Sequence, residues 1–134
     1  MNNEGFALII LYSLFIIRYA LVVLRQNFDP IRHHHERWDG EGYPDKLKGS
    51  SISQLARIVT LADAFDAMTS DRPYRKGFSF EFAARTMISE AGRQFDTAVV
   101  DAFKARKAAI FARLEEMGKK PSPHASDIRL DPVA

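Results

Sequence analysis

The sequence predicts an all-α helical bundle, and three observations lead to this prediction. Downstream of residue 50, apolar residues recur at steps of three and four in three separate stretches. Each stretch is flanked by residues that commonly begin or stop a helix. The chain shows no run of alternating apolar and polar residues, which is the pattern of a half-buried strand.

Size and composition set the frame for these helices. The chain has 134 residues, of which 46% are hydrophobic and 27% charged, as expected for one small globular domain. The formal net charge of +2 is too small to argue for nucleic acid, so we expect no nucleic-acid partner. Because the chain lacks cysteine, it has neither disulfides nor thiolate metal ligands.

The first element is the nearly continuous apolar run at residues 6–24, FALIILYSLFIIRYALVVL. Its length would span a bilayer, but an arginine at mid-membrane, here Arg18, costs roughly 2.5–3.5 kcal/mol. Two interpretations stay open: a membrane helix that leaves the rest of the chain in the cytoplasm, or a helix buried against the protein or a partner. We therefore treat residues 1–27 as an apolar helical segment and expect a cytoplasmic location, with or without membrane attachment.

The domain proper is expected over residues 28–118, beginning where Asp29-Pro30 interrupts the apolar run. Ser51 and Gln54 form a capping-box pattern, which predicts that a helix begins at Ser51 and runs to residue 70. The basic sequence DRPYRKG then predicts a loop over residues 71–77.

Two further helices follow, one from Ser79 to Gly92 and one from Asp96 to Gly118. Their apolar stripes consist of Phe80, Ala84, Met87, Ile88 and Ala91 in the first and Val99, Phe103, Ile110, Leu114 and Met117 in the second. Residues 119–134 are polar and proline-rich without periodicity, so we predict a mobile tail.

Two carboxylates lie on the apolar face of the predicted helix 51–70. That face is formed by Ile52, Leu55, Val59 and Ala62, whereas Ser53, Arg57 and Thr60 are predicted on the polar face. At 100° per residue, Asp63 and Asp66 fall within the apolar arc. A buried carboxylate must be compensated, either by hydrogen bonds from the protein or by a bound metal ion, and both remain open.

The sequence HHHERWDGEGYP, residues 33–44, offers nitrogen ligands for such an ion. Successive helical residues are about 100° apart, so at most two of the three histidines can converge, and we expect His33 to face solvent. Glu36 and Asp39 are candidates either as ligands or as groups that orient the imidazoles. Imidazole together with carboxylate suits iron, manganese or zinc.

Three segments resemble the C-terminal half of HD-GYP domains, bacterial metal-dependent phosphohydrolases that hydrolyse cyclic di-GMP. They are HHERWDGEGYP, ARIVTLADAFDAMTSDRPYRKG and GRQFDTAVVDAF, and the match covers roughly residues 30–105. The resemblance implies an all-helical fold and two-metal hydrolysis of cyclic di-GMP to pGpG or GMP, with iron or manganese as the ion.

The resemblance also implies roles for individual residues. His34, His35 and Asp63 match metal ligands, while Asp66 has no matching ligand role and is expected to be a structural hydrogen-bond acceptor. Arg72 and Arg75 match basic positions near the substrate phosphates; the alternative is a solvated loop. Gly42, Tyr43 and Pro44 match the loop that supports substrate access or contacts with a partner such as a GGDEF domain; the alternative is a plain tight turn.

One part of the family pattern is not matched. Residues 1–32 contain no histidine, and their only acidic residues are Glu4 and Asp29, so the upstream His-Asp pair is absent. We therefore expect a truncated domain that is catalytically incomplete, holds one ion at most and has no assignable catalytic residue. The alternative is a non-catalytic module that binds a nucleotide or a partner. The uncovered apolar faces would pack on residues 6–24 or in a homodimer.

Overall fold

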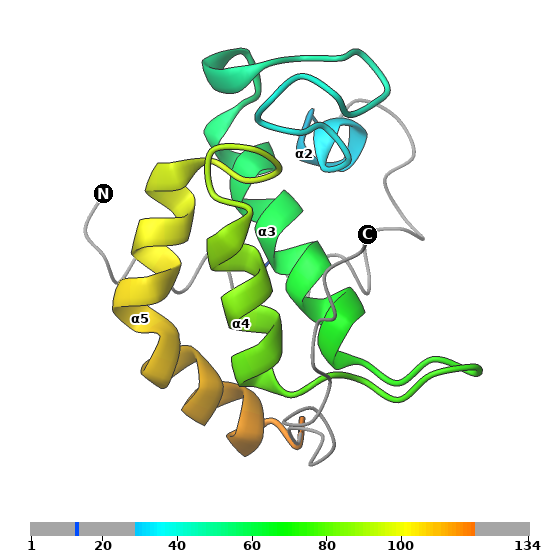
Figure 1. Ribbon diagram of the computed structural model, residues 1–134, viewed down its shortest axis with the longest axis vertical. Helices are drawn as coiled ribbons and strands as arrows, with labels where there is room; N and C mark the ends of the chain where they lie inside the picture. Colours follow the sequence, from blue (N-terminus) through cyan, green and yellow to red (C-terminus); the bar gives the residue numbers. More distant parts are fainter. Residues whose placement is uncertain (1–12, 14–28, 120–134) are drawn as a thin grey trace, which may run out of the picture.

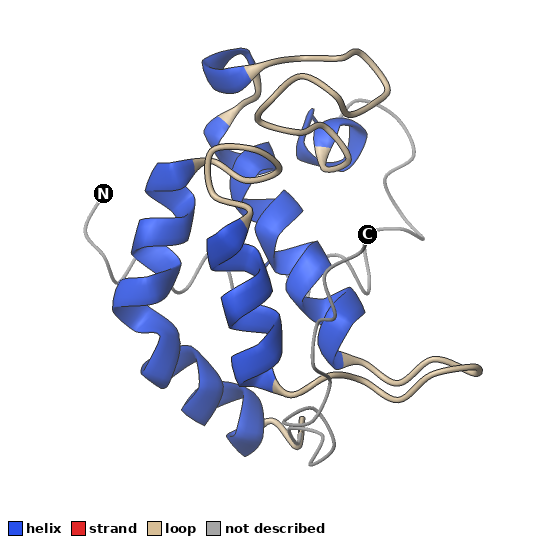
Figure 2. Cartoon of the chain, viewed as in Figure 1, coloured by secondary structure: helices blue, strands red, loops and turns tan. Residues whose placement is uncertain are grey.

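A computed structural model describes Ser13 and residues 29–119 of the chain. The predicted apolar segment, Ser13 apart, and the predicted tail beyond Lys119 lie outside the described residues. Within the described part, no helix is both long and apolar enough to cross a membrane. The same part contains helices and two isolated bridges but no strand, which confirms the all-α prediction (Figure 2).

Four α-helices and one 3-10 turn make up the described fold. In chain order they are α2 (Asp29–His33), η1 (Gly49–Ser51), α3 (Gln54–Thr69), α4 (Phe80–Ser89) and α5 (Thr97–Glu116). The helices α3, α4 and α5 lie side by side, and the loop between α2 and α3 folds over the end of the bundle where α3 begins (Figure 1). Because α3 packs against α2 as well as α4 and α5, it is covered on both sides.

Local capping sets where the three long helices begin. Ser79 accepts a hydrogen bond from the backbone N–H of Phe82 at 3.2 Å, and Asp96 accepts one from Ala98 at 3.0 Å, as predicted for α4 and α5. The predicted start of α3 at Ser51 is wrong. Ser53 is the cap, accepting from the N–H of Ala56 at 3.2 Å.

The core lies between α3, α4 and α5. Phe65 of α3 packs against Phe80 and Phe103, with both ring centroids 5.8 Å from its own. The predicted stripe residues that are buried are Phe80, Ala84, Met87, Val99, Phe103, Ile110 and Leu114. Met117 was predicted in this stripe but is 58% exposed, because α5 ends at Glu116.

The apolar face predicted for α3 is only partly correct. Ile52, Val59 and Ala62 are buried, but Leu55 is 38% exposed. Thr60, predicted to face away from the core, is buried because the residues that follow α2 pack on that side. Its hydroxyl lies 2.8 Å from the carbonyl of Ala56, one turn earlier in α3.

Arg57 ties α3 to the start of α5. The sequence placed Arg57 on the polar face, away from Asp63 and Asp66, and its ion pair is with a residue outside α3. Its guanidinium donates to Asp96 at 2.7 Å and to the carbonyl of Ile52 at 2.8 Å, and it lies over the ring of Trp38. Asp96 therefore caps α5 and forms a cross-helix ion pair at the same time.

Candidate metal centre

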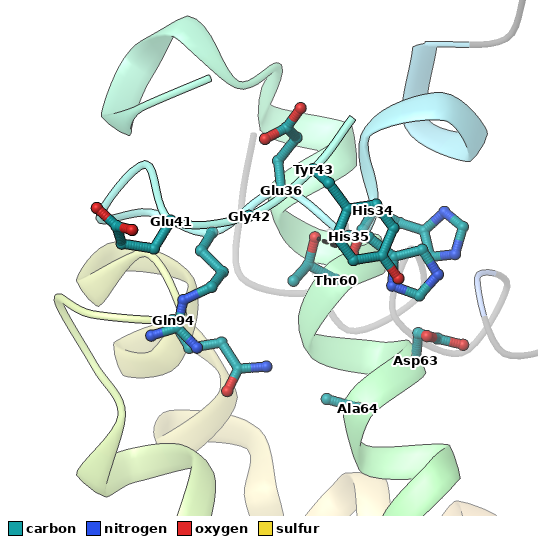
Figure 3. Close-up of a pocket in the computed structure, with 11 residues that line it drawn as sticks. His34, His35, Glu36, Glu41, Gly42, Tyr43, Thr60, Asp63, Ala64 and Gln94 are labelled. Carbon is teal, nitrogen blue, oxygen red and sulfur yellow. Dashed lines mark hydrogen bonds between the residues drawn. The ribbon is translucent and has the colours of Figure 1, made fainter. Parts of the chain in front are cut away.

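The structure brings together the three residues that the sequence indicated as ligands. His34 and His35 directly follow α2, and Asp63 lies in the middle of α3 (Figure 3). One ligand atom from each side chain lies within 4.8 Å of the other two. Asp63 is half-buried, so the carboxylate predicted on the apolar face lies at its edge, facing the imidazoles.

His34 is fixed in one orientation by the backbone around it. Its Nδ1 donates to the carbonyl of Ile31 at 2.6 Å, which leaves the lone pair on Nε2 available. The Thr60 hydroxyl lies 3.0 Å from the His34 carbonyl and attaches this residue to α3. Thr60, which the helical pattern predicted on the polar face, is buried and supports the backbone of His34.

His35 lies beside His34, with ring centroids 4.1 Å apart, and its other neighbour is Tyr43. The rings of His35 and Tyr43 are stacked at 4.9 Å with an interplanar angle of 18°. His35 is exposed, yet desolvation of its ring by the groups around it lowers its pKa; the neighbouring His34 adds to this effect and Asp63 opposes it. A lowered pKa favours the neutral imidazole, which is the form that binds metal ions.

A pocket of about 310 Å³ opens beside the three ligands. It is lined by His34, His35, Glu36, Arg37, Glu41, Gly42, Tyr43, Thr60, Asp63, Ala64 and Gln94. The amide of Gln94 points toward α3 across this pocket (Figure 3). Gln94 reaches the pocket because the backbone N–H of Trp38 donates to its carbonyl at 3.1 Å.

Arg37 and Gln94 were not predicted as pocket residues. Arg37 lies only two residues beyond His35, but its guanidinium donates to Asp39 at 2.8 Å and 3.1 Å. Bonded to Arg37 and to the N–H of Glu41, Asp39 has its pKa lowered to about 2. The only sequence signal for Gln94 was its place in the segment GRQFDTAVVDAF.

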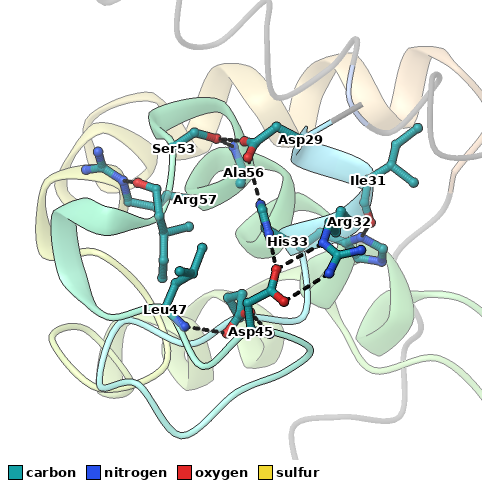
Figure 4. Close-up of polar contacts among 12 residues, drawn as sticks. Asp29, Ile31, Arg32, His33, Asp45, Leu47, Ser53, Ala56 and Arg57 are labelled. Carbon is teal, nitrogen blue, oxygen red and sulfur yellow. Dashed lines mark hydrogen bonds and ion pairs between the residues drawn. The ribbon is translucent and has the colours of Figure 1, made fainter. Parts of the chain in front are cut away.

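His33 does not face solvent, so that prediction is wrong. Its Nδ1 and Nε2 lie 2.7 Å from carboxylate oxygens of Asp29 and Asp45, and only 12% of its side chain is exposed (Figure 4). Burial lowers the pKa of His33, but Asp45 and Asp29 outweigh this effect and raise it above its usual value. Asp45 also receives two hydrogen bonds from Arg32, both 2.9 Å long.

Glu36 is a loop anchor in this structure. Its side chain is fully buried, and its two oxygens accept the backbone N–H groups of Asp45 at 2.6 Å and Leu47 at 3.1 Å. A ring nitrogen of His33 and carboxylate oxygens of Glu36 and Asp45 also lie within 4.8 Å of one another, which is a second group of metal-ligand type. All three groups already bond to protein partners, so hydrogen bonding accounts for this second cluster.

The loop of Gly42, Tyr43 and Pro44 lies directly against the histidine backbone. A Cβ on Gly42 would come within 2.5 Å of the His35 carbonyl and of the Arg37 nitrogen. Only glycine fits this position. The Tyr43 N–H donates to the His35 carbonyl at 3.3 Å, and the peptide bond between Tyr43 and Pro44 is cis.

Arg72 and Arg75 are not brought to the three ligands. Their loop projects beyond the C-terminal end of α3, at least about 9 Å along the axis from Asp63 at 1.5 Å per residue. Arg75 donates to the carbonyls of Ala67 at 3.1 Å and Lys76 at 2.9 Å, whereas Arg72 is exposed. Their role near substrate phosphates stays a prediction.

Asp66 is an acceptor of structural hydrogen bonds, from the Ser70 hydroxyl at 3.2 Å and from Lys119. It was placed on the apolar face, yet 44% of its side chain is exposed. One turn of α3 therefore separates a carboxylate that faces the imidazoles from one that faces solvent and a lysine.

The arrangement of His34, His35 and Asp63 fits a divalent cation. Two ligands of one ion lie at most about 4.2 Å apart, which is twice a metal–nitrogen bond of about 2.1 Å. With ligand atoms within 4.8 Å of one another, small side-chain rotations bring all three to one ion. The two imidazoles and the carboxylate would hold the ion at the wall of the pocket.

The chain is similar in sequence to known proteins. A family model described as an HD domain matches residues 20–99. The chain is 43% identical over 91 residues to the cyclic di-GMP phosphodiesterase response regulator RpfG of Xanthomonas campestris pv. campestris, covering 68% of this chain and 22% of the relative. It is 49% identical over 84 residues to the cyclic di-GMP phosphodiesterase PA4108 of Pseudomonas aeruginosa, covering 63% of this chain and 19% of the relative.

The solved structure of a cyclic GMP-AMP specific phosphodiesterase of Vibrio cholerae, V-cGAP3, shares the fold. It matches with a TM-score of 0.54 and 21% identity, over 84% of this chain and 26% of that chain. The chain thus spans about a fifth of the length of the curated relatives it matches. By the family model and by its motifs, the chain belongs to the HD-domain family and, within it, to the HD-GYP group.

Proposed function

We propose that this chain carries part of the metal site of a cyclic di-GMP phosphodiesterase. His34, His35 and Asp63 hold one divalent ion at the wall of the pocket. The observation that carries the proposal is the approach of these three ligand atoms to within 4.8 Å beside an open cavity. The names of the relatives, which are phosphodiesterases for cyclic di-GMP and for 3'3'-cGAMP, support the substrate class.

The residues of the chain prepare the site before any ion arrives. The bond from His34 to Ile31 selects the tautomer with a free Nε2, and desolvation of the His35 ring lowers its pKa, which favours the neutral form. Asp63 contributes a negative charge at the cavity wall. When bound, a divalent ion supplies positive charge toward a phosphodiester oxygen and makes water more acidic. Iron or manganese is the proposed ion, as the family resemblance implies.

The pocket is sized for part of a cyclic dinucleotide. Its volume of about 310 Å³ is at the lower end of the range of about 300–1,000 Å³ for small-molecule sites. A phosphate near His35 would place the attached nucleoside toward Gln94, whose amide can both donate and accept hydrogen bonds. Contacts of Arg72 and Arg75 with substrate phosphates, a GGDEF partner and a homodimer stay predictions.

Metal content tests this proposal, with Asp63→Asn and Asp66→Asn as a matched pair of variants. We expect one ion per wild-type chain, with loss of the ion in Asp63→Asn and in His34→Ala. Asp66→Asn is the control, because it removes a carboxylate one turn further along α3 that bonds, among the described residues, to Ser70 and Lys119. Equal metal content in all four proteins would refute the proposed site.

Calorimetry with cyclic di-GMP separates catalysis from binding. Two-metal hydrolysis needs ligands for a second ion, and the described residues offer one three-ligand group that bonding within the protein leaves free. We therefore expect metal-dependent binding of cyclic di-GMP without turnover by this chain, as in a regulatory module. Turnover that disappears in His34→Ala would instead establish a complete enzyme, and absence of binding would refute both functions.

A further inference from the structure

Four consecutive residues of the sequence HHHE divide between two tasks. The outer two, His33 and Glu36, bond to the loop of residues 42–47, whereas the inner two, His34 and His35, face Asp63. Two loop anchors thus flank the two proposed ligands within one short segment. The position of the loop is thereby tied to the position of the imidazoles.

The anchoring of this loop is dense and largely buried. Glu36, with 1% of its surface exposed, accepts two backbone N–H groups from the far side of the loop. On the near side, Gly42 packs so closely that a Cβ would lie 2.7 Å from the Glu36 Cα. Tyr43 follows at once, and its N–H donates to the His35 carbonyl. These contacts leave the Tyr43 backbone little freedom.

The anchored loop places the Tyr43 ring beside the His35 imidazole. It lies flat against His35 at 4.9 Å, yet 60% of Tyr43 is exposed. Burial in a core therefore does not explain its position. No hydrogen bond of its hydroxyl is found among the described residues. Within that part of the chain, the Tyr43 ring stacks on the His35 imidazole. A flat ring on one face restricts rotation of the imidazole about its χ2 angle.

We propose that Tyr43 is a positioning residue that holds the His35 imidazole in the orientation in which it meets Asp63 and a metal ion. The inference rests on the proposed role of His35 as a ligand. The stacked face of the Tyr43 ring orients the imidazole, and the Tyr43 hydroxyl is not needed. Groups that orient metal ligands typically change metal affinity by about 10- to 100-fold when they are removed.

Cobalt titration, followed by the visible absorption of Co²⁺, tests the proposal without relying on activity. The full chain is compared as wild type, Tyr43→Phe, Tyr43→Ala and Tyr74→Ala. Tyr74 is the control because it is 85% exposed and lies in the loop beyond α3. We expect Tyr43→Phe and Tyr74→Ala to match the wild type within about twofold, and Tyr43→Ala to bind cobalt at least about tenfold more weakly. If Tyr43→Ala unfolds, Tyr43→Leu keeps apolar bulk without a flat ring.

A second readout needs no metal. In NMR spectra of the metal-free protein, the ring current of residue 43 shifts the imidazole protons of His35 upfield. That shift should persist in Tyr43→Phe and disappear in Tyr43→Ala. Failure of the wild type to bind cobalt would refute the proposed function. The NMR comparison would still test whether Tyr43 orients His35. Unchanged affinity and unchanged His35 signals in Tyr43→Ala would overturn the inference, as would equal loss in Tyr43→Phe.

Discussion

Replacing Gly42 by alanine tests how tightly the loop is seated on the histidine segment. The added Cβ would lie 2.5 Å from the His35 carbonyl oxygen and 2.5 Å from the Arg37 nitrogen, and both are backbone atoms. Neither atom can move away as the end of a flexible side chain can. The loop must therefore shift outward, and the bond from the Tyr43 N–H to the His35 carbonyl at 3.3 Å is lost.

The magnitude follows from these two effects. Overpacking against a fixed backbone costs about 1–3 kcal/mol, and loss of the hydrogen bond adds about 0.5–1.5 kcal/mol. We expect Gly42→Ala to lower the free energy of unfolding by about 2–4 kcal/mol. At about 4 °C per kcal/mol, the melting temperature falls by about 8–16 °C.

Thermal unfolding and cobalt titration together check this prediction. Gly118→Ala is the control, since its φ of 82° strains an alanine while no atom lies within 4 Å of the added Cβ. Both variants lose stability, but only Gly42→Ala should also weaken cobalt binding, because it displaces Tyr43 from His35. A Gly42→Ala protein that melts within about 2 °C of the wild type would refute the reasoning.

Three further predictions concern the frame around the site. Arg57→Ala leaves the buried carboxylate of Asp96 without its ion pair and should cost about 2–3 kcal/mol in urea unfolding; a loss below about 0.5 kcal/mol would show that the pair is dispensable. Asp39 has its pKa lowered to about 2, so the stability gained from its bonds to Arg37 is full above the ordinary value of 3.8 and is lost as the pH falls toward 2. The difference in melting temperature between wild type and Asp39→Asn should accordingly shrink between pH 5 and pH 2, and a constant difference would argue against this assignment. Ser79→Ala removes the cap of α4 and should cost about 1 kcal/mol in urea unfolding, whereas an unchanged midpoint would mean that the cap is not used.

Helix periodicity and capping residues predicted the fold because those signals are local. Ser79 and Asp96 cap the helices for which they were proposed. The prediction that Ser51 caps α3 was wrong because Ser53, two residues later, is also a typical capping residue. The structure joins the Ser53 hydroxyl to Asp29, 24 residues earlier, and this tertiary contact selects the cap.

For the site, too, local motifs were predictive and tertiary contacts were not. The motif match brought His34, His35 and Asp63 to attention, and the structure places them together. The motif match could not show that His33 and Glu36 anchor a loop, because that role depends on where residues 45–47 fold back.

The pocket wall at Gln94 was missed for a related reason. It is set by pairing between two loops far apart in sequence, in which the N–H groups of Trp38 and Asp39 donate to the carbonyls of Gln94 and Arg93. Neither loop carries a periodic pattern that a reading of the sequence could use.

Anomalous diffraction from a crystal of this chain grown with Co²⁺ tests the central claim most directly. Data collected at the cobalt edge locate the ion independently of any assay. We predict one strong peak within about 2.3 Å of an imidazole nitrogen of His34, one of His35 and a carboxylate oxygen of Asp63. A peak at His33 and Asp45, or no peak beside Asp63, would contradict it.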